Sequence, residues 1–363
     1  MTEKIPNASV HQLAEWLAAA KKEDYRFVRV DKRTFNVTVD FFLEMPPEMQ
    51  RALRFSADPA ASLGVRINEP IQLQGHSDEK FSMFLTAYKA RPSPPLPASP
   101  SNLLVIGELA ARYRTQSLTP WFRRHFEAFI LSRPTNPALR SGPDEIFLGS
   151  MNMAKYFFGT NSDVCRSLTD RWIKRLHRKE LDPLIAMLFG YAHGLHSLRA
   201  HGYYTYMVSV EQKIMQNEPI DVGGGGRLEA FHVRHVMAGY HSLRAYSARM
   251  FLNAPEFERY GAQAPTSVSN ADHDRNRPIR TCHPDEHKLC VTAWEARWIM
   301  ASQTPSTVPA IDIMQRLSVL ERCLRKDKVL QKSMNPECMN LALKVVVDKI
   351  QKISRQLQHH FDF

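Results

Sequence analysis

Hydrophobic and polar residues alternate near the N-terminal end of the chain and change to helical spacing farther along. Alternation with a period of two is typical of a strand that is buried on one face. Two such stretches flank a polar turn at residues 31–33, and an amphipathic run follows over residues 41–53. The pattern therefore predicts a strand pair followed by short helices. The alternating apolar positions are Tyr25, Phe27, Val30, Phe35 and Val37.

After Leu103 the apolar residues recur every three or four positions, which is the spacing of one face of an α-helix. Two such stripes, separated by a short polar turn, predict a helix pair over residues 104–130. The first stripe is Leu104, Ile106, Leu109, Ala110 and Tyr113, and the second is Leu118, Trp121, Phe122, Phe126 and Ile130.

The C-terminal end of the chain predicts another amphipathic helix, whose apolar residues follow the heptad rhythm. Asn335-Pro336-Glu337 is a suitable start, because proline is accepted in the first turn of a helix. One interpretation packs this helix against an apolar stripe of its own domain, and the alternative is an intermolecular coiled coil. The heptad positions are Leu343, Val346, Ile350, Ile353 and Leu357, and the facing stripe is Ile313, Leu317, Leu320 and Leu324.

Four stretches rich in proline, glycine or polar residues divide the chain, at residues 92–100, 134–143, 219–226 and 261–284. They predict an N-terminal helix or extension over residues 1–20 and a mixed domain over 21–133. A helical domain over 144–260 and C-terminal helices over 285–363 follow. The polar segment 261–284 between these two is the best candidate for a disordered loop.

Composition limits the classes of protein that the chain can be. A hydrophobic content of 44% and a charged content of 23% are ordinary for a globular protein, and no apolar run reaches the length of a membrane span. The first residues lack the pattern of a signal peptide, so an intracellular protein of the cytoplasm or nucleus is expected. Five cysteines in 363 residues favour reduced thiols over a disulfide framework.

The formal net charge of +11 is spread over the chain, except for one basic cluster at residues 166–179. The simpler interpretation is the solvated face of a helix whose buried stripe is Leu168, Trp172, Ile173 and Leu176. The alternative is a nucleic-acid-associated regulator that uses this segment to contact phosphates. The basic residues are Arg166, Arg171, Lys174, Arg175, Arg178 and Lys179.

The most specific chemical pattern is a group of cysteine and histidine residues, Cys282, His283, His287 and Cys290, to which Cys338 could add a thiolate. Four converging sulfur and nitrogen ligands are what tetrahedral zinc requires. Cys282, His287, Cys290 and Cys338 are therefore the candidate metal ligands, and a polar loop leading into a helix is the alternative. The glycine run at residues 223–226 lacks the spacing of a phosphate-binding loop and predicts a linker. No catalytic motif is found, so an enzyme is not expected.

Residues 24–118 carry one further pattern, Ile71-x-Leu73-x-Gly75-x-Ser77, followed at helical spacing by Phe81, Leu85 and Tyr88. Together with the strand pair and the helices on either side, this order resembles the BTB/POZ domain over about a third of the chain. That family has a strand pair, a helical hairpin, a strand, a helix and a final helix pair. The resemblance implies an α+β fold, in which a BTB/POZ domain precedes a mostly α-helical C-terminal region.

Motifs of the C-terminal region extend the resemblance to BTB proteins of mushroom-forming fungi. They are residues 165–172, 200–206 and 334–338, and the ending His359-His360-Phe361. The resemblance implies a non-catalytic interaction module, an adaptor or scaffold that binds protein partners still to be identified. Contact with nucleic acid or a membrane is not expected from it.

The chain departs from the family's polar pattern after its second predicted strand. Where the family commonly has histidine followed by a basic residue, this chain has Thr38 and Val39, and Phe42, Pro46 and Met49 stand at the next family positions. Asp24 could still supply the acidic residue of the charged pocket found in many BTB homodimers, but Val39 cannot supply its basic partner. The resemblance therefore leaves self-association open.

Cullin-binding members of the family use a segment of the form hydrophobic-any-Glu before a strand. Ile67-Asn68-Glu69 has this form, so a Cullin-type ligase scaffold is one candidate partner. The interaction residues implied by the resemblance are Asp24, Phe27, Ile67 and Glu69.

Overall fold

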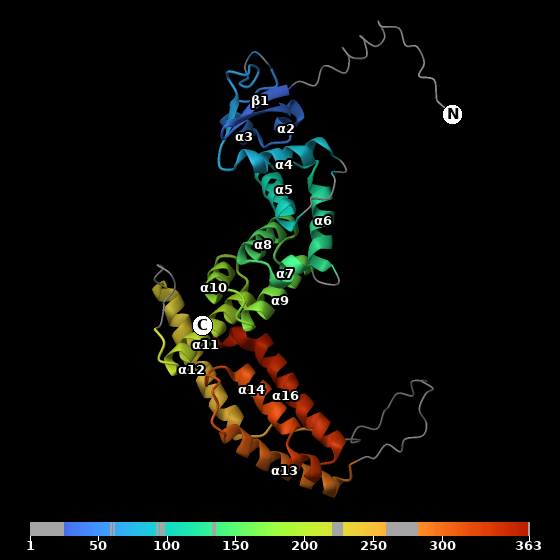
Figure 1. The fold of residues 1–363 in the computed structure, drawn as a ribbon, viewed down its shortest axis with the longest axis vertical. Coiled ribbons are helices and arrows are strands. Elements are labelled where there is room, and N and C mark those ends of the chain that lie inside the picture. The colour runs from blue at the N-terminus through green and yellow to red at the C-terminus, as the bar shows by residue number, and fades with distance from the viewer. Residues whose placement is uncertain are drawn as a thin grey trace, which may run out of the picture. The chain divides into compact units, whose positions relative to one another are not determined.

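The computed structural model of the chain describes residues 25–58, 60, 62–91, 94, 99–132, 136–219, 228–258 and 282–361. It is mostly helical and contains one small three-stranded sheet, so the coarse α+β class is correct (Figure 1). The chain divides into two compact units, Met1–Arg171 and Trp172–Phe363. Asp24 and the predicted extension at residues 1–20 lie outside the described residues, as does most of the predicted loop at 261–284.

The sheet has the strand order β2-β1-β3. The strands β1 (Tyr25–Val30) and β2 (Arg33–Thr38) form an antiparallel hairpin, in which Tyr25 pairs with Thr38 and Val30 with Arg33. The third strand, β3 (Ile71–Leu73), runs parallel to β1, and Val28 pairs with Ile71. The hairpin confirms the predicted strand pair, and Val30, Phe35 and Val37 are buried as predicted. The predicted buried positions Tyr25 and Phe27 are wrong, because Arg26 and Val28 share the buried face of β1 with Val30, while Tyr25 is exposed and Phe27 is half-buried.

Gly64 shapes the loop that leads into β3. Its carbonyl accepts a hydrogen bond from the Phe27 amide at 2.7 Å, and its own amide donates to the Glu69 carbonyl at 2.8 Å. Gly64 has a φ of +79°, and a Cβ atom there would lie 2.8 Å from the Phe27 carbonyl oxygen. Glycine is therefore the residue that both the backbone conformation and the close approach to β1 favour.

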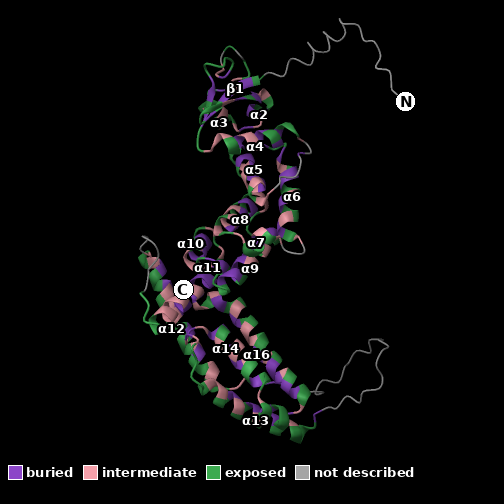
Figure 2. Cartoon of the chain, in the orientation of Figure 1, coloured by how far each residue is buried: buried purple, intermediate pink, exposed green. Residues whose placement is uncertain are grey.

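Aromatic rings fill the core between the sheet and the helices of the first unit. Phe41 makes edge-to-face contacts with Phe42, Phe81, Phe84, Tyr88 and Tyr113, at centroid distances between 5.3 and 6.3 Å. All six rings are buried. Figure 2 colours the helices α2, α4 and α5, on which these residues lie, by the burial of each residue. Edge-to-face packing lets rings from segments far apart in the sequence share one core. The helices of this unit are α2 (Val39–Leu43), α3 (Pro47–Ala52), α4 (Asp78–Lys89), α5 (Pro100–Tyr113), α6 (Thr119–Leu131), α7 (Pro137–Ser141) and α8 (Asp144–Phe158).

The predicted helix pair is confirmed by α5 and α6. Ser99 caps α5 by accepting from the Asn102 amide, Pro100 occupies the first turn, and the helix ends at Arg114 in a left-handed conformation. The predicted stripe of α6 is buried throughout. The predicted break at residues 134–143 contains α7 and lies inside the first compact unit.

The helix α9 (Asp163–His177) contains the point at which the two units divide. Seven helices and a short terminal turn follow among the described residues, and they share one hydrophobic core from Met187 to Phe361. They are α10 (Pro183–Ala192), α11 (His196–Met215), α12 (Ala230–Leu252), α13 (Pro284–Gln303), α14 (Ile313–Arg325), α15 (Lys328–Ser333), α16 (Pro336–Gln356) and η2 (Leu357–His360).

The predicted terminal helix is α16, and it packs against α14 of its own unit. Leu343, Val346 and Ile353 are buried in the shared core, and so is the whole predicted stripe of α14. This arrangement confirms the interpretation in which the helix packs within its own domain. In the described part of the chain, no helix combines the length and apolar character needed to cross a membrane.

Candidate functional site

The predicted interaction residues of the first unit differ in their accessibility. Ile67 is 63% exposed at the tip of the loop between α3 and β3, and the side chain of Glu69 is also exposed. Hydrogen bonds from Gly64 N to Glu69 O and from Glu69 N to Arg66 O hold this loop in shape. Phe27 is half-buried on β1. The loop therefore presents an apolar side chain to solvent on a constrained backbone.

The basic segment at residues 166–179 lies on α9 and the turn after it. Its predicted stripe is buried, which confirms the amphipathic helix. Arg175 is buried and its Nε donates to Glu180 at 2.9 Å, while Arg178 pairs with the other oxygen of Glu180 at 3.1 Å. Arg166 pairs with Asp163 at 3.1 Å. Three of the six basic groups thus contact carboxylates, which reduces the charge available to phosphates.

The cysteine and histidine residues converge where α13 and α16 begin. Cys282 precedes α13, His287 lies in its first turns, and Cys338 lies in the first turn of α16. The ligand atoms of these three residues all lie within 4.8 Å of one another, and Cys338 Sγ is 3.7 Å from His287 Nδ1. Cys282 and Cys338 are buried and His287 is half-buried. This group could hold a metal ion.

Cys290, the fourth predicted ligand, lies one turn after His287 on α13 and is not in the group of three whose ligand atoms all lie within 4.8 Å of one another. Its sulfur accepts a hydrogen bond from the Asn335 amide at 3.3 Å, and it interacts electrostatically with both Cys282 and Cys338. Asn335 also caps α16 by accepting from the amides of Glu337 and Cys338. The cap of α16 therefore fixes the position of one thiol and contacts another. His283 stays outside the group, because it caps α13 and is exposed.

Burial makes the thiols of Cys282 and Cys290 weak acids while no cation is near. It raises the pKa of Cys290, and burial together with the hydrogen bond to Cys338 raises the pKa of Cys282 to about 12. A divalent cation reverses this preference, because it binds the thiolate and displaces the proton. Phe257 and Trp294 shield one side of the group, since the Phe257 ring lies 5.2 Å from that of His287 and 6.1 Å from that of Trp294.

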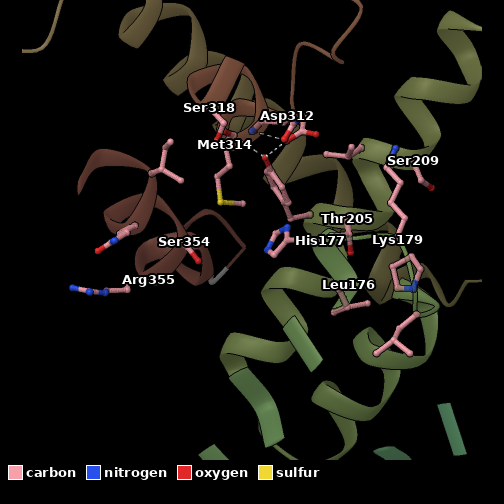
Figure 3. A pocket seen from close by; sticks show the side chains of 17 residues that line it. Leu176, His177, Lys179, Thr205, Ser209, Asp312, Met314, Ser318, Ser354 and Arg355 are labelled. Carbon is pink, nitrogen blue, oxygen red and sulfur yellow. Dashed lines mark hydrogen bonds between the residues drawn. The ribbon is translucent and has the colours of Figure 1, made fainter. Parts of the chain in front are cut away.

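A second candidate site is a cavity of about 590 Å³ in the second unit, lined by residues of α9, α11, α14 and α16 and of the loops beside them (Figure 3). His177 Nε2 lies 2.9 Å from His201 Nδ1, and His201 Nε2 lies 3.4 Å from the Ser354 hydroxyl. Burial lowers the pKa of His177 to about 4 and of His201 to about 3, so both imidazoles are neutral at pH 7.

A phenol and a carboxylate form the opposite wall of this cavity. Tyr204 donates from its hydroxyl to Asp312 at 2.9 Å and accepts from the Met314 amide at 3.3 Å. Burial raises the pKa of Tyr204 well above its usual value and also raises that of Asp312. Sequence reasoning did not find this cavity, because its polar residues come from four separate helices and share no local motif.

Comparisons with family models, with curated proteins and with solved structures found no match to this chain.

Proposed function

We propose that the protein is a non-catalytic interaction module whose first unit is a BTB/POZ-like domain. The observation that carries this proposal is the order and pairing of the elements over residues 25–131. A strand hairpin is followed by two short helices, a third strand, a helix and a helix pair, which is the order that the sequence resemblance implies. The proposed role is that of an adaptor or scaffold for another protein.

The loop at residues 64–69 is the surface that we propose for this contact. Val65 is 41% exposed and Ile67 is 63% exposed, and backbone hydrogen bonds constrain the loop before any partner binds. A loop whose backbone is already constrained loses little conformational entropy on binding, which favours affinity. The Cullin-type scaffold stays one candidate partner for Ile67 and Glu69.

The test is affinity capture with the full chain and two matched variants, Ile67→Asp and Val329→Asp. Val329 is 54% exposed in the second unit, so both substitutions place a charge on an exposed apolar position. We expect the same proteins to be captured by the wild type and Val329→Asp and to be lost with Ile67→Asp. Capture of nothing beyond a tag-only control would contradict an interaction module.

The Cullin candidate is tested separately with purified scaffold, under conditions where a known adaptor binds. Association that Glu69→Lys abolishes would support it. A chain that captures other proteins through Ile67 but does not bind the scaffold would exclude the Cullin role and leave the interaction module standing.

We also propose that the cysteine and histidine group binds zinc through Cys282, His287, Cys290 and Cys338. Three thiols and one imidazole are a ligand set of structural zinc sites, and the amide of Asn335 donates to Cys290 as backbone amides do to zinc-bound thiolates. The metal would join the beginning of α13 to the beginning of α16. Its role would be to stabilise the second unit.

Elemental analysis of the purified chain tests the metal and its ligands together. We expect zinc in stoichiometric amount, and a large loss in Cys282→Ser and Cys338→Ser. The controls are Cys165→Ser, a buried cysteine of the first unit, and Cys323→Ser, an exposed one, and both should retain the metal. Wild-type protein that folds without bound metal, even after zinc is added, would disprove the site.

A further inference from the structure

The cavity beside His177 has the size and wall of a small-molecule site. Its volume of about 590 Å³ lies within the roughly 300–1,000 Å³ that is usual for such sites. Aliphatic side chains make up much of the wall, so the interior favours an apolar ligand body. These side chains are Leu176, Leu181, Pro183, Val208, Met314 and Ile350.

Among the described residues of the wall, Asp312 is the one that carries a carboxylate, and protein donors already engage it. Asp312 accepts from the Tyr204 hydroxyl at 2.9 Å and from the Gln315 amide at 3.1 Å. Both hydrogen bonds go to Oδ1 of Asp312, and the carboxylate also interacts electrostatically with Lys179. The wall therefore offers a positively charged ligand little uncompensated negative charge.

His177 supplies a hydrogen-bonding group that the protein leaves available. His177 lines the cavity, and its Nε2 contacts the buried His201, which leaves Nδ1 for the cavity. Figure 3 shows His177 between Thr205 on one side and Ser354 on the other. This chain of hydrogen bonds has two arrangements. In the first, His201 donates to the Ser354 backbone and accepts from Nε2 of His177; in the second, the Ser354 hydroxyl donates to His201, His201 donates to His177, and Nδ1 of His177 carries a proton that it can donate to a ligand. A negatively charged ligand group in the cavity would favour the second arrangement, because that arrangement gives it a hydrogen-bond donor.

Two cations accompany this imidazole. Lys179 and Arg355 line the cavity from opposite sides, and within the described residues neither is in an ion pair with a carboxylate. The ammonium of Lys179 donates to the amide oxygen of Gln212. Lys179 follows the last residue of α9, His177, by two positions, and both residues line the same cavity.

We propose that this cavity binds a small amphipathic carboxylate. The carboxylate lies between Lys179 and the His177 ring, and the aliphatic body lies against Val208, Met314 and Ile350. A single carboxylate fits better than a phosphate, because the two cations stand apart and phosphate sites gather several donors around one anion. This proposal is independent of the interaction module and of the zinc site.

Calorimetric titration of the full chain with decanoate and with decanol tests the proposal. The two probes share an aliphatic body and differ in charge. We expect saturable binding of decanoate and an affinity for decanol that is at least about tenfold lower, since a charge-assisted hydrogen bond is lost. Absence of saturable decanoate binding, or equal affinities for the two probes, would overturn the proposal.

Two variants locate the bound carboxylate. Lys179→Met removes the ammonium from an exposed side chain, and His177→Phe keeps a ring without its nitrogens. Each should weaken decanoate binding by roughly tenfold and leave decanol binding unchanged. The control is Lys174→Met, an exposed lysine of α9 that does not line the cavity. Decanoate binding that is unchanged in both variants, with circular dichroism like that of the wild type, would place the ligand elsewhere.

Discussion

Tyr204→Phe removes one buried hydroxyl and leaves the ring in place, so its effect on stability can be worked out from two hydrogen bonds. The hydroxyl donates to Asp312 at 2.9 Å and accepts from the Met314 amide at 3.3 Å. The variant leaves a buried amide unpaired and takes one donor from a largely buried carboxylate. Each loss costs about 1–3 kcal/mol, and the longer bond belongs at the low end of that range. We expect the unfolding free energy of the second unit to fall by about 2–4 kcal/mol.

Urea unfolding followed by tryptophan fluorescence measures this change, because three of the five tryptophans lie in the second unit. The matched control is Tyr206→Phe on the same helix, since the Tyr206 hydroxyl has no hydrogen-bond partner among the described residues. Its cost should be within about 0.5 kcal/mol of zero. A Tyr204→Phe variant as stable as this control would refute the role given to the buried pair. The three reporting residues are Trp172, Trp294 and Trp298.

Three further substitutions test other contacts of the second unit. Burial raises the pKa of Asp312, so the protein loses stability as pH rises through that pKa and the carboxylate ionises. Asp312→Asn should therefore match or exceed the thermal midpoint of the wild type at pH 7. Any such advantage should disappear below about pH 4, where the wild-type carboxyl group is protonated in both the folded and the unfolded chain. Burial alone would raise the pKa of Asp327, but hydrogen bonds from the Leu330 amide and from Arg297 lower it. The ionised carboxylate therefore stabilises the folded protein above the ordinary pKa of aspartate, and this contribution is lost in acid. Arg297→Met should therefore cost about 1–2 kcal/mol at pH 7 and less at pH 3, and an equal cost at both would contradict the pairing. Gly239→Ala would place a Cβ atom 2.0 Å from the Phe361 ring. It should lower the free energy of unfolding by about 1–3 kcal/mol in the wild type but by little in a Phe361→Ala background. A double-mutant cycle measures this difference.

Local periodicity predicted the helices well, because the residues that bury one face of a helix are close in sequence. The stripe of α16 shows this, since Leu343 and Val346 are buried where their spacing placed them. The same periodicity also indicated the apolar stripe of α14 as a packing partner for this helix. It could not choose between a partner helix in the same chain and one in another copy, because both bury the same face.

Identical short sequences can occupy different structural positions, which limits prediction from motifs. The pentapeptide His-Ser-Leu-Arg-Ala occurs at residues 196–200 and 241–245. Its first copy begins α11, whereas the second lies inside α12. In both copies the leucine, Leu198 or Leu243, is fully buried. The helical face is therefore preserved, while the position along the helix depends on capping and on contacts outside the motif.

The two candidate sites depend on long-range contacts to different degrees. Three of the cysteine and histidine residues are close in sequence, so their spacing was visible, but the approach of Cys338 depends on how α16 packs against α13. In the cavity, His177, Tyr204 and Asp312 are widely separated in sequence and each belongs to an ordinary amphipathic element. No local signal distinguishes them from core residues, so only the folded chain brings them together.

The parallel pairing of β1 with β3 has a consequence for the order in which the first unit folds. The hairpin of β1 and β2 closes through a turn of two residues and can form as soon as both strands have left the ribosome. The other edge of β1 has to wait for Ile71 to be synthesised, because Val28 pairs with that residue. During this interval β1 exposes unpaired amides and carbonyls, so the interval is when we expect nascent chains to be most prone to aggregate.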